Sequence, residues 1–341
     1  MLSKEIFLIV IVGDYEIMNI GIGGGPMELP DNLVLETGVL NDALILKREI
    51  LYKGMNGRFV ERFFLSPSKS FIFKPLTNNG QLGKEVWVHQ HILPKFPPIY
   101  PKIISFKICE QPELNWMIVE DLGALNHEFN EISALEVMKL VAWWHSMPIE
   151  KIGEVPTMGL KPLINDIVSD VFNSKEEFLR QLPILDLEQA TIECVYSLLE
   201  KTNFSNKLVL SHGDLHVGNF SLVDNQLKII DWEHTHLNSP YWDLYHLIDM
   251  SHPLFPKQVT SELRKQLLKV YIEQVNFEIE KSLFQKEYYL FSAVFSMWMI
   301  GLIKNDLQAK DQKWSEDQLN RQMTETVLSL QQCAEELFYL L

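Results

Sequence analysis

The pattern of apolar residues changes near Asp121–Gly123, and this change limits the folds open to the chain. Before it, short apolar runs alternate with turn signals such as Ser66–Ser68 and Asn78–Gly80. Runs of this kind are typical of β-strands. The predicted strands are Arg62–Leu65, Ser70–Lys74, Ile103–Ile108 and Asn115–Glu120, and one helix is predicted among them over Glu85–Leu93.

After the change, apolar residues recur at helical spacing over long stretches. The predicted helices include Ser133–Met147, Leu185–Thr202, Ser261–Leu283 and Gln318–Leu341. Ser133 followed by Glu136 predicts a capping box at the start of the first. We therefore predict an α+β, bilobal chain: residues 1–122 form a small β-rich lobe, with an extension up to about residue 45, and residues 123–341 form a large, mostly α-helical lobe. A cleft between two lobes is the expected place for a ligand.

The charge balance and the cysteine spacing exclude several classes of protein. The chain has 341 residues and a formal net charge of -15, and such an acidic surface repels the phosphates of nucleic acids. Cys109, Cys194 and Cys333 lie far apart, which argues against a disulfide framework or a zinc knuckle and suits a reducing compartment. Ile6–Val12 lacks the cleavage site of a signal peptide. Tyr288–Ile303 is shorter than the roughly 20 residues that cross a bilayer, so it is predicted as a core helix. We predict a cytoplasmic protein without membrane or nucleic-acid partners.

One strand-rich stretch interrupts the helical half of the chain. Its first strand is predicted over Leu208–Leu210 and its second over Leu227–Ile230. Asp224 and Asn225 are turn-forming residues that precede the second strand. We therefore predict that the two strands form a hairpin-like pair, and that a small sheet lies within the helical half.

Polar side chains are placed at the ends of these two strands. Asp214 follows the first strand in a tight His-Gly turn, Asn219 lies five positions later, and Asp231 ends the second strand. Two carboxylates and one amide oxygen would therefore converge at one end of the sheet. Oxygen ligands of this kind suit Mg²⁺ bound to the phosphates of a nucleotide. The alternative is a structural hairpin whose acidic side chains are merely solvated.

The run His-Gly-Asp-Leu-His-Val-Gly-Asn, from His212 to Asn219, is followed by Ile-Asp-Trp-Glu around Asp231 and then by Asp243. This order resembles the catalytic segment of the aminoglycoside phosphotransferase and choline kinase family, within the protein-kinase-like superfamily. The resemblance implies that Asp214 is the base that orients and deprotonates the substrate hydroxyl, and that Asn219 and Asp231 hold Mg²⁺. It also implies that His212 packs beneath the loop and that Asp243 braces the loop by hydrogen bonds to its backbone.

The same resemblance implies a nucleotide-binding role for the first lobe. Lys74 ends a predicted strand and is expected to bind the phosphates, with Glu85 on the following helix as its ion-pair partner. The alternative is an ordinary strand-end lysine and a solvated glutamate. Trp116–Gly123 is similar to the hinge of the family, whose backbone, here at Glu120 and Leu122, would pair with the adenine edge.

The glycine-rich loop is where the sequence departs from protein kinases. Lys53–Arg58 contains two glycines before a predicted strand, but it does not follow the spacing Gly-x-Gly-x-x-Gly. Gly21–Pro26 is richer in glycine, yet it neither follows a convincing strand nor opens a helix. We interpret it as a flexible turn.

These features predict an enzyme that uses ATP and Mg²⁺ to phosphorylate a hydroxyl group of a small molecule; GTP is the alternative nucleotide. The net charge favours a cationic acceptor, and the resemblance implies one that is aminoglycoside-, choline- or sugar-like. Aromatic residues near the site are either a cage for an ammonium group or part of the core; they are Trp232, Tyr241, Trp242 and Tyr245. His145, at the end of a predicted helix, is expected to be a core histidine. A kinase-fold binding or scaffold protein with weak catalysis is the second hypothesis, but Lys74, Asp214, Asn219 and Asp231 are all present.

Overall fold

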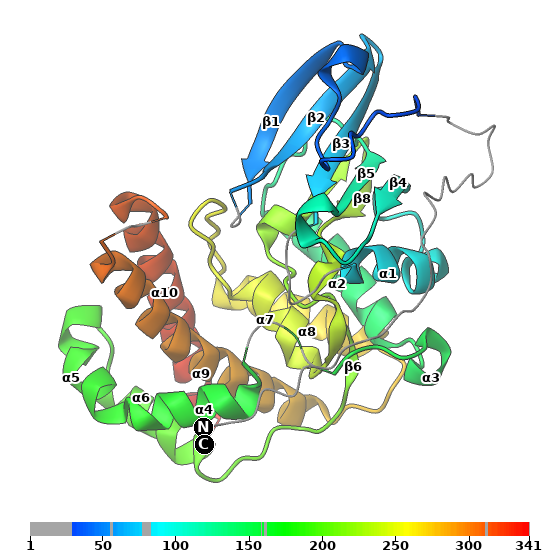
Figure 1. The fold of residues 1–341 in the computed structure, drawn as a ribbon. Coiled ribbons are helices and arrows are strands. Elements are labelled where there is room, and N and C mark those ends of the chain that lie inside the picture. Colours follow the sequence, from blue (N-terminus) through cyan, green and yellow to red (C-terminus); the bar gives the residue numbers. More distant parts are fainter. Residues whose placement is uncertain are drawn as a thin grey trace. The chain divides into compact units, whose positions relative to one another are not determined.

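The computed structural model describes residues 29–54, 57–76, 83–157, 159, 162–310 and 313–340. These residues fall into two compact units (Figure 1). The first unit contains the described residues up to Val86 together with Lys102–Asp121. The second contains Trp87–Pro101 and the described residues from Leu122 onward. The segment Trp87–Pro101 thus joins the helical unit, although it precedes the last two strands of the first unit in the sequence.

The first unit is built on one antiparallel sheet with the strand order β1-β2-β3-β5-β4. Its strands are β1 (Lys47–Lys53), β2 (Phe59–Ser66), β3 (Lys69–Pro75), β4 (Ile103–Lys107) and β5 (Trp116–Glu120). Alternate side chains of a strand point to opposite faces. Phe71 and Ile118 therefore belong to one buried cluster, and Met117 and Val119 belong to another. The four predicted strands are confirmed, and β1 is a fifth that was not predicted. Two short 3-10 helices, η1 (Asp42–Leu44) and η4 (Pro112–Leu114), complete this unit.

The second unit is mostly helical, and its long helices enclose one large apolar core. The helices are α1 (Lys84–His91, which begins in the first unit), α2 (Glu131–His145), α3 (Ile149–Ile152), α4 (Ile164–Asn173), α5 (Lys175–Leu185), α6 (Gln189–Leu199), α7 (Pro240–Ile248), α8 (Ser261–Gln274), α9 (Lys281–Gln308) and α10 (Glu316–Tyr339), with the 3-10 helix η3 (Leu93–Lys95). In Figure 1, α9 and α10 lie side by side. The predicted α+β class, with a β-rich first part and a helical second part, is confirmed.

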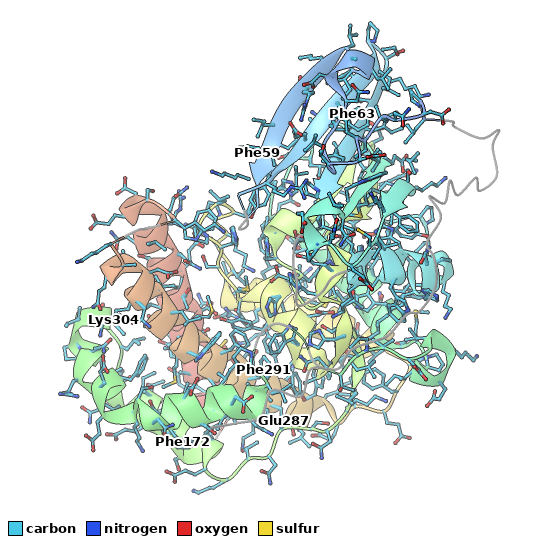
Figure 2. The ribbon with its side chains drawn as sticks, viewed as in Figure 1. Phe59, Phe63, Phe172, Glu287, Phe291 and Lys304 are labelled. Carbon is cyan, nitrogen blue, oxygen red and sulfur yellow. The ribbon has the colours of Figure 1, made fainter. Side chains whose placement is uncertain are left out.

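Helix α9 links several elements of the second unit (Figure 2). Glu287 accepts a hydrogen bond of 2.7 Å from the hydroxyl of Tyr241 on α7. Lys304 forms an ion pair of 3.0 Å with Glu177 on α5. By length and composition α9 passes the test for a membrane span, but more than half of its apolar window is buried within the unit. The prediction of a core helix over Tyr288–Ile303 is therefore confirmed.

The helices differ from the prediction at several boundaries. The helix predicted over Leu185–Thr202 is interrupted, because Asp186 has a left-handed backbone (φ 54°) that ends α5 before α6 begins. The helix predicted over Ser261–Leu283 ends at Gln274, and α9 begins only at Lys281. The capping box of α2 also starts three residues earlier than predicted.

The N-cap of α2 is Asn130, and Ser133 occupies the third helical position. The Asn130 side chain accepts a hydrogen bond of 2.9 Å from the Ser133 N–H. The Ser133 hydroxyl in turn accepts one of 3.1 Å from the Asn130 N–H. Asn is as good an N-cap as Ser, so the reciprocal pair forms with serine as the inner partner.

Candidate functional site

Two small antiparallel sheets form the strand-rich stretch of the second unit. The hairpin consists of β7 (Phe220–Val223) and β8 (Gln226–Ile229), whereas β6 (Val209–Ser211) pairs with β9 (His236–Asn238). The predicted pairing of the strand at 208–210 with the strand at 227–230 is therefore wrong.

The cause of this error is the length of the turn. Asp224 and Asn225 have left-handed backbones, with φ of 48° and 60°. A two-residue turn of this type joins the strands that directly flank it. Val223 is therefore opposite Gln226, and β7, which was not predicted, is the partner of β8.

The hairpin brings Asn219 and Asp231 to the same end. Phe220 is opposite Ile229, and the Ile230 N–H donates a hydrogen bond of 2.9 Å to the Asn219 carbonyl. Asn219 and Ile230 therefore flank the last pair, and Asp231 directly follows Ile230. Asp231 itself has φ 64°, an unusual value for a residue with a side chain, and the chain turns there from β8 into the 3-10 helix η6 (Trp232–His234).

Asp214 is tied to this end of the hairpin through its backbone. The Asn219 Nδ2 donates a hydrogen bond of 2.7 Å to the Asp214 carbonyl. The same carbonyl accepts the His216 N–H at 2.9 Å. The nitrogen of the buried Asn219 amide is therefore held by the loop, and its oxygen is the other polar atom of that side chain.

The His212 side chain connects the loop that carries Asp214 with the end of the hairpin at Ile230. Its Nδ1 accepts the Asp214 N–H at 3.3 Å, and its Nε2 donates to the Ile230 carbonyl at 3.0 Å. Burial lowers the pKa of His212, which favours the neutral ring that can accept at one nitrogen and donate at the other. The ring also packs against Trp232, with 4.6 Å between ring centres. The predicted place of His212 beneath the loop is confirmed.

Asp243 on α7 braces the same loop from the core. Its fully buried carboxylate accepts hydrogen bonds from the His212 N–H at 2.8 Å, the Gly213 N–H at 3.1 Å and the Ser211 hydroxyl at 2.6 Å. His145 lies 3.2 Å from it through Nε2. Burial acts to raise the pKa of Asp243, but the hydrogen bond from His145 and the charge interactions with His145 and His212 outweigh this effect and hold the pKa below its usual value. The predicted bracing role of Asp243 is confirmed.

His145 is buried, as expected, but it does more than fill the core. Its Nδ1 lies 2.9 Å from the hydroxyl of Tyr271 on α8, and its Nε2 faces Asp243. Trp144 also donates to the Asp243 carboxylate, at 3.4 Å. The contact between His145 and Asp243 has no signal in the sequence, since the two residues lie 98 positions apart.

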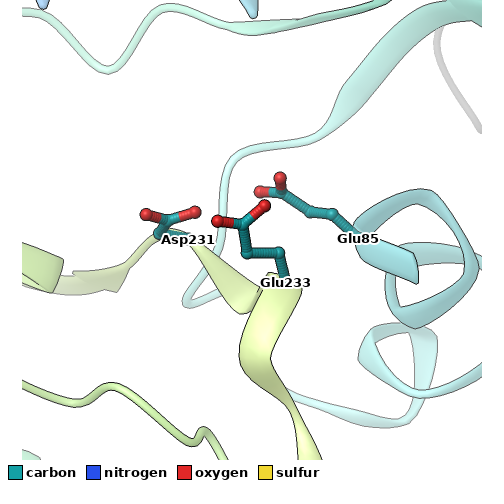
Figure 3. A group of neighbouring side chains, drawn as sticks. All are labelled: Glu85, Asp231 and Glu233. Atoms are coloured by element: carbon teal, nitrogen blue, oxygen red, sulfur yellow. The ribbon is translucent and has the colours of Figure 1, made fainter. Parts of the chain in front are cut away.

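Glu233 adds a second carboxylate beside Asp231. Figure 3 shows both side chains on the turn that leaves β8, and their carboxylate oxygens lie within 4.8 Å of each other. Glu233 also lies 3.3 Å from the Nε2 of His234. Burial lowers the pKa of His234, but the contact with Glu233 outweighs it and raises the pKa overall. Glu233 stood in the motif but was given no role in the sequence analysis.

The expected ion pair of the first unit is present. Lys74 on β3 lies 2.6 Å from Glu85 on α1, and the Glu85 side chain is almost entirely buried. Glu120 ends β5, and its N–H donates to the Lys102 carbonyl at 2.8 Å. Asp121 is the last residue of the first unit, and Leu122, which follows it, belongs to the second unit.

The two glycine-rich segments are only partly within the described residues. Gly54 accepts the Gly57 N–H at 2.9 Å and donates to the Arg58 carbonyl at 2.8 Å, so the ends of this loop form a tight turn. Residues 55 and 56 at its tip lie outside the described part of the chain, as does the whole of Gly21–Pro26.

The four aromatic residues near the motif, for which a cage and a core position were the alternatives, are core residues. All are at most 1% exposed, namely Trp232, Tyr241, Trp242 and Tyr245. Trp242 packs its ring on Phe295 and donates its Nε1–H to the Gly213 carbonyl at 3.0 Å. Of the two alternatives, the structure therefore supports the core, and the Trp242 side chain contacts the loop from within it.

The fold of this chain is similar to that of solved choline kinases and aminoglycoside phosphotransferases. Residues 171–277, which include all the loop residues described above, match the model of the phosphotransferase enzyme family. The resemblance proposed from the motif is confirmed, and the fold is that of choline kinases and aminoglycoside phosphotransferases.

Particular relatives can be named for the structure and for the sequence. A choline kinase from Cryptosporidium parvum Iowa II superposes with a TM-score of 0.53 at 16% identity, covering 88% of this chain and 91% of that one. A spectinomycin phosphotransferase in complex with ADP and spectinomycin gives 0.53 at 16% identity, over 84% and 94%. Protein LicA of Haemophilus influenzae (strain KW20 / Rd) is 28% identical over 119 residues. That match covers 32% of this chain and 42% of LicA, so it spans less than half of that relative.

Proposed function

We propose that this protein is a kinase that uses Mg²⁺ and ATP to phosphorylate a hydroxyl group of a small molecule. The observation that carries the proposal is the set of hydrogen bonds around His212, which join Asp214, Asn219 and the Ile230 residue that directly precedes Asp231. The relatives support the same class, since one is named as a choline kinase and another is bound to ADP and spectinomycin.

The donor set at the hairpin end fits Mg²⁺. Asn219 uses its amide nitrogen on the loop, which leaves the amide oxygen as the donor suited to a cation. Asp231 contributes a carboxylate, and the Glu233 carboxylate lies within 4.8 Å of it. Oxygen atoms alone are the ligands that Mg²⁺ prefers. Asn219 and Asp231 would hold the ion, which when bound neutralises charge on the phosphate oxygens.

Asp214 has the position and the support required of the base. Its backbone is fixed on both sides by His212 and Asn219, while its side chain remains 19% exposed. In the proposed reaction the acceptor oxygen forms a bond to the γ-phosphorus and its proton passes to the Asp214 carboxylate. The bond from the γ-phosphorus to the bridging oxygen breaks, and its electron pair leaves with ADP. Positioning of the acceptor contributes most in such a loose transition state.

The first unit supplies the residues proposed for nucleotide binding. Lys74 is held by Glu85 at 2.6 Å, so its ammonium group is kept in one place and is suited to bind the α- and β-phosphates. The backbone at Glu120 and Leu122 is proposed to bind the adenine edge. The end of β5 is well anchored, since Asp121 accepts hydrogen bonds from Arg62 at 2.7 Å and from Ser70 at 2.7 Å.

The acceptor is proposed to be a small cationic alcohol or amino sugar. The net charge of -15 favours cations at the surface. The solved relatives are consistent with this class, since their names include choline and spectinomycin. The buried aromatic residues of the core play no part in this proposal.

The test combines nucleotide binding with ADP release. Titration calorimetry with Mg-ATP, and separately with Mg-GTP, would compare the wild type with Asp231→Asn, which keeps the size of the side chain. We expect binding by the wild type and at least tenfold weaker binding by the variant. ADP release would then be measured with choline, spectinomycin and kanamycin as acceptors. Failure of the folded wild type to bind either nucleotide would overturn the proposal, and binding without any ADP release would favour the scaffold hypothesis.

A further inference from the structure

His216, the second histidine of the motif, has no role in the reaction proposed above. Its ring is 8% exposed, and its Nδ1 accepts the Gly218 N–H at 3.0 Å, which caps the 3-10 helix η5 (Val217–Asn219). A neutral ring that accepts at Nδ1 carries its hydrogen at Nε2. That Nε2 lies 3.6 Å from the Asp214 Oδ2. The loop therefore directs an N–H group toward the proposed base.

A stack of rings holds the His216 imidazole in this orientation. The His252 ring lies parallel to it, with 4.6 Å between centres and 8° between planes. Phe255 packs on both rings, at 5.9 Å from His216 and 5.1 Å from His252. The Nδ1 of His252 accepts the Leu254 N–H at 3.2 Å, so the second imidazole is also fixed in its plane. The segment 252–255 follows α7, and the motif gave no sign that it reaches the loop.

Gly218 shows that the motif is shaped to admit this stack. A Cβ atom at position 218 would overlap the Phe255 ring and would lie 2.7 Å from the His216 Cε1. The glycine before Asn219 is therefore required by the close approach of the rings. The stack is built into the loop, and the Nε2 edge of its His216 ring faces Asp214.

We propose that His216 is a positioning residue that restrains the Asp214 carboxylate through its Nε2–H. The separation of 3.6 Å is too long for a hydrogen bond. Contacts of this kind commonly shorten when substrate binds, and at the present distance the interaction is electrostatic. A fixed carboxylate meets the acceptor hydroxyl in one orientation, which raises kcat without a change in nucleotide affinity. This inference rests on the proposed function, because it assigns Asp214 as the base.

Two substitutions distinguish a role of His216 in positioning Asp214 from a purely structural role as the cap of η5. His216→Asn keeps an oxygen near the place of Nδ1, so it can still accept the Gly218 N–H, but it is too short to reach Asp214. His216→Gln extends an amide N–H toward the place of Nε2 and can still contact the carboxylate. His91→Asn, on the exposed surface of α1, controls for the loss of a histidine elsewhere.

The experiment measures ADP release from Mg-ATP for the full chain, with water as acceptor and with any active acceptor from the panel above, together with Tm and the KM for ATP. We expect His216→Asn to lower kcat by about 10- to 100-fold, with KM for ATP within about twofold of the wild type. We expect His216→Gln to recover most of that loss and Tm to change by less than about 3 °C in either variant.

Three other results would overturn the inference. Equal kcat for His216→Asn and the wild type means that the contact with Asp214 has no effect on the reaction. Equal losses in both variants, in proportion to a fall in Tm, mean that His216 only stabilises the loop. Absence of ADP release from the wild type overturns the proposed function, and this inference with it. The wild type is measured first, so this result is distinguished from a failure of the inference alone.

Discussion

Gly213 and His234 approach each other so closely that no side chain fits between them. A Cβ atom on Gly213 would overlap the His234 carbonyl oxygen and would lie 3.0 Å from the His234 Cβ. Gly213 also has φ 88°, which disfavours any residue with a side chain. The glycine of the His-Gly-Asp motif therefore allows the loop that carries Asp214 to lie against the turn that carries Asp231.

Replacement of this glycine is expected to damage the loop. Gly213→Ala introduces both the overlap and the unfavourable φ, so the free energy of unfolding should fall by about 2 kcal/mol or more. Urea denaturation measures this loss. Gly301→Ala on α9 is the matched control, because nothing lies within 4 Å of a Cβ there. That variant should be unchanged or more stable by up to about 1 kcal/mol. Equal effects of the two substitutions would contradict the steric argument.

The buried carboxylate of Asp243 predicts a pH dependence at the acid end. Because its pKa is lower in the folded chain, its ionised form stabilises the fold above the unfolded pKa of 3.8, and this contribution is lost as the pH falls through the folded pKa. Asp243→Asn should therefore lower the free energy of unfolding by about 3–5 kcal/mol at pH 7, and by progressively less below pH 4. Denaturation with urea from pH 3 to 7 measures the difference. A difference that stays constant over this range would show that the carboxylate charge is not involved.

Lys257 predicts a second rise of stability with pH, in a higher pH range. Its Nζ donates to the carbonyls of His246 and Leu247 at the end of α7, and burial lowers its pKa from 10.5 to about 7. Between these two pKa values Lys257 is protonated in the unfolded chain and neutral in the folded chain, so the free energy of unfolding rises with pH. Below about pH 7 Lys257 is charged in both states, and the full free-energy cost of burying the charge is present. Relative to Lys257→Met, the wild type should gain about 1.4 kcal/mol per pH unit between pH 7 and 9. Parallel stability curves for the two proteins would refute the lowered pKa.

The ion pair of the first unit predicts a selective loss of nucleotide binding. If Lys74 binds the phosphates, Lys74→Met should weaken Mg-ATP binding by about tenfold or more, since it removes the charge but keeps the length of the side chain. Glu85→Gln should have a smaller effect in the same direction. Lys69→Met, at the other end of β3, is the control. The affinity of the three variants for Mg-ATP is measured by calorimetry. Equal losses of affinity in Lys69→Met and Lys74→Met would contradict the assignment of Lys74.

The main features of the fold were predictable because they depend on local periodicity. The strands of the first unit and the helices of the second follow from runs of apolar residues at two different spacings. The assembly of Asp214, Asn219 and Asp231 was predictable because the three residues share one continuous motif. The pairing of the strands was not, since a turn at Asp224 and Asn225 fixes only its own neighbours, and β6 finds its partner in β9 farther along the chain.

The supporting residues of the site could not be found in the same way. His145 reaches Asp243 from a helix almost one hundred positions away in the sequence, and its run Trp-Trp-His has the composition of an ordinary core. His252 and Phe255 lie beyond the motif on a loop with no periodic pattern. Their contacts depend on how the helices pack, which no local spacing records.

The chain of contacts from Asp243 through His145 to Tyr271 affects how the protein should lose activity when it is heated. It joins the loop to α7, α2 and α8, so the loop is tied directly to three helices of the core. Enzymes whose active sites are carried on independent loops commonly lose activity at temperatures where the remainder of the chain is still intact. Here the two events should coincide: the midpoint of thermal inactivation and the midpoint of the loss of helical circular dichroism should fall at the same temperature.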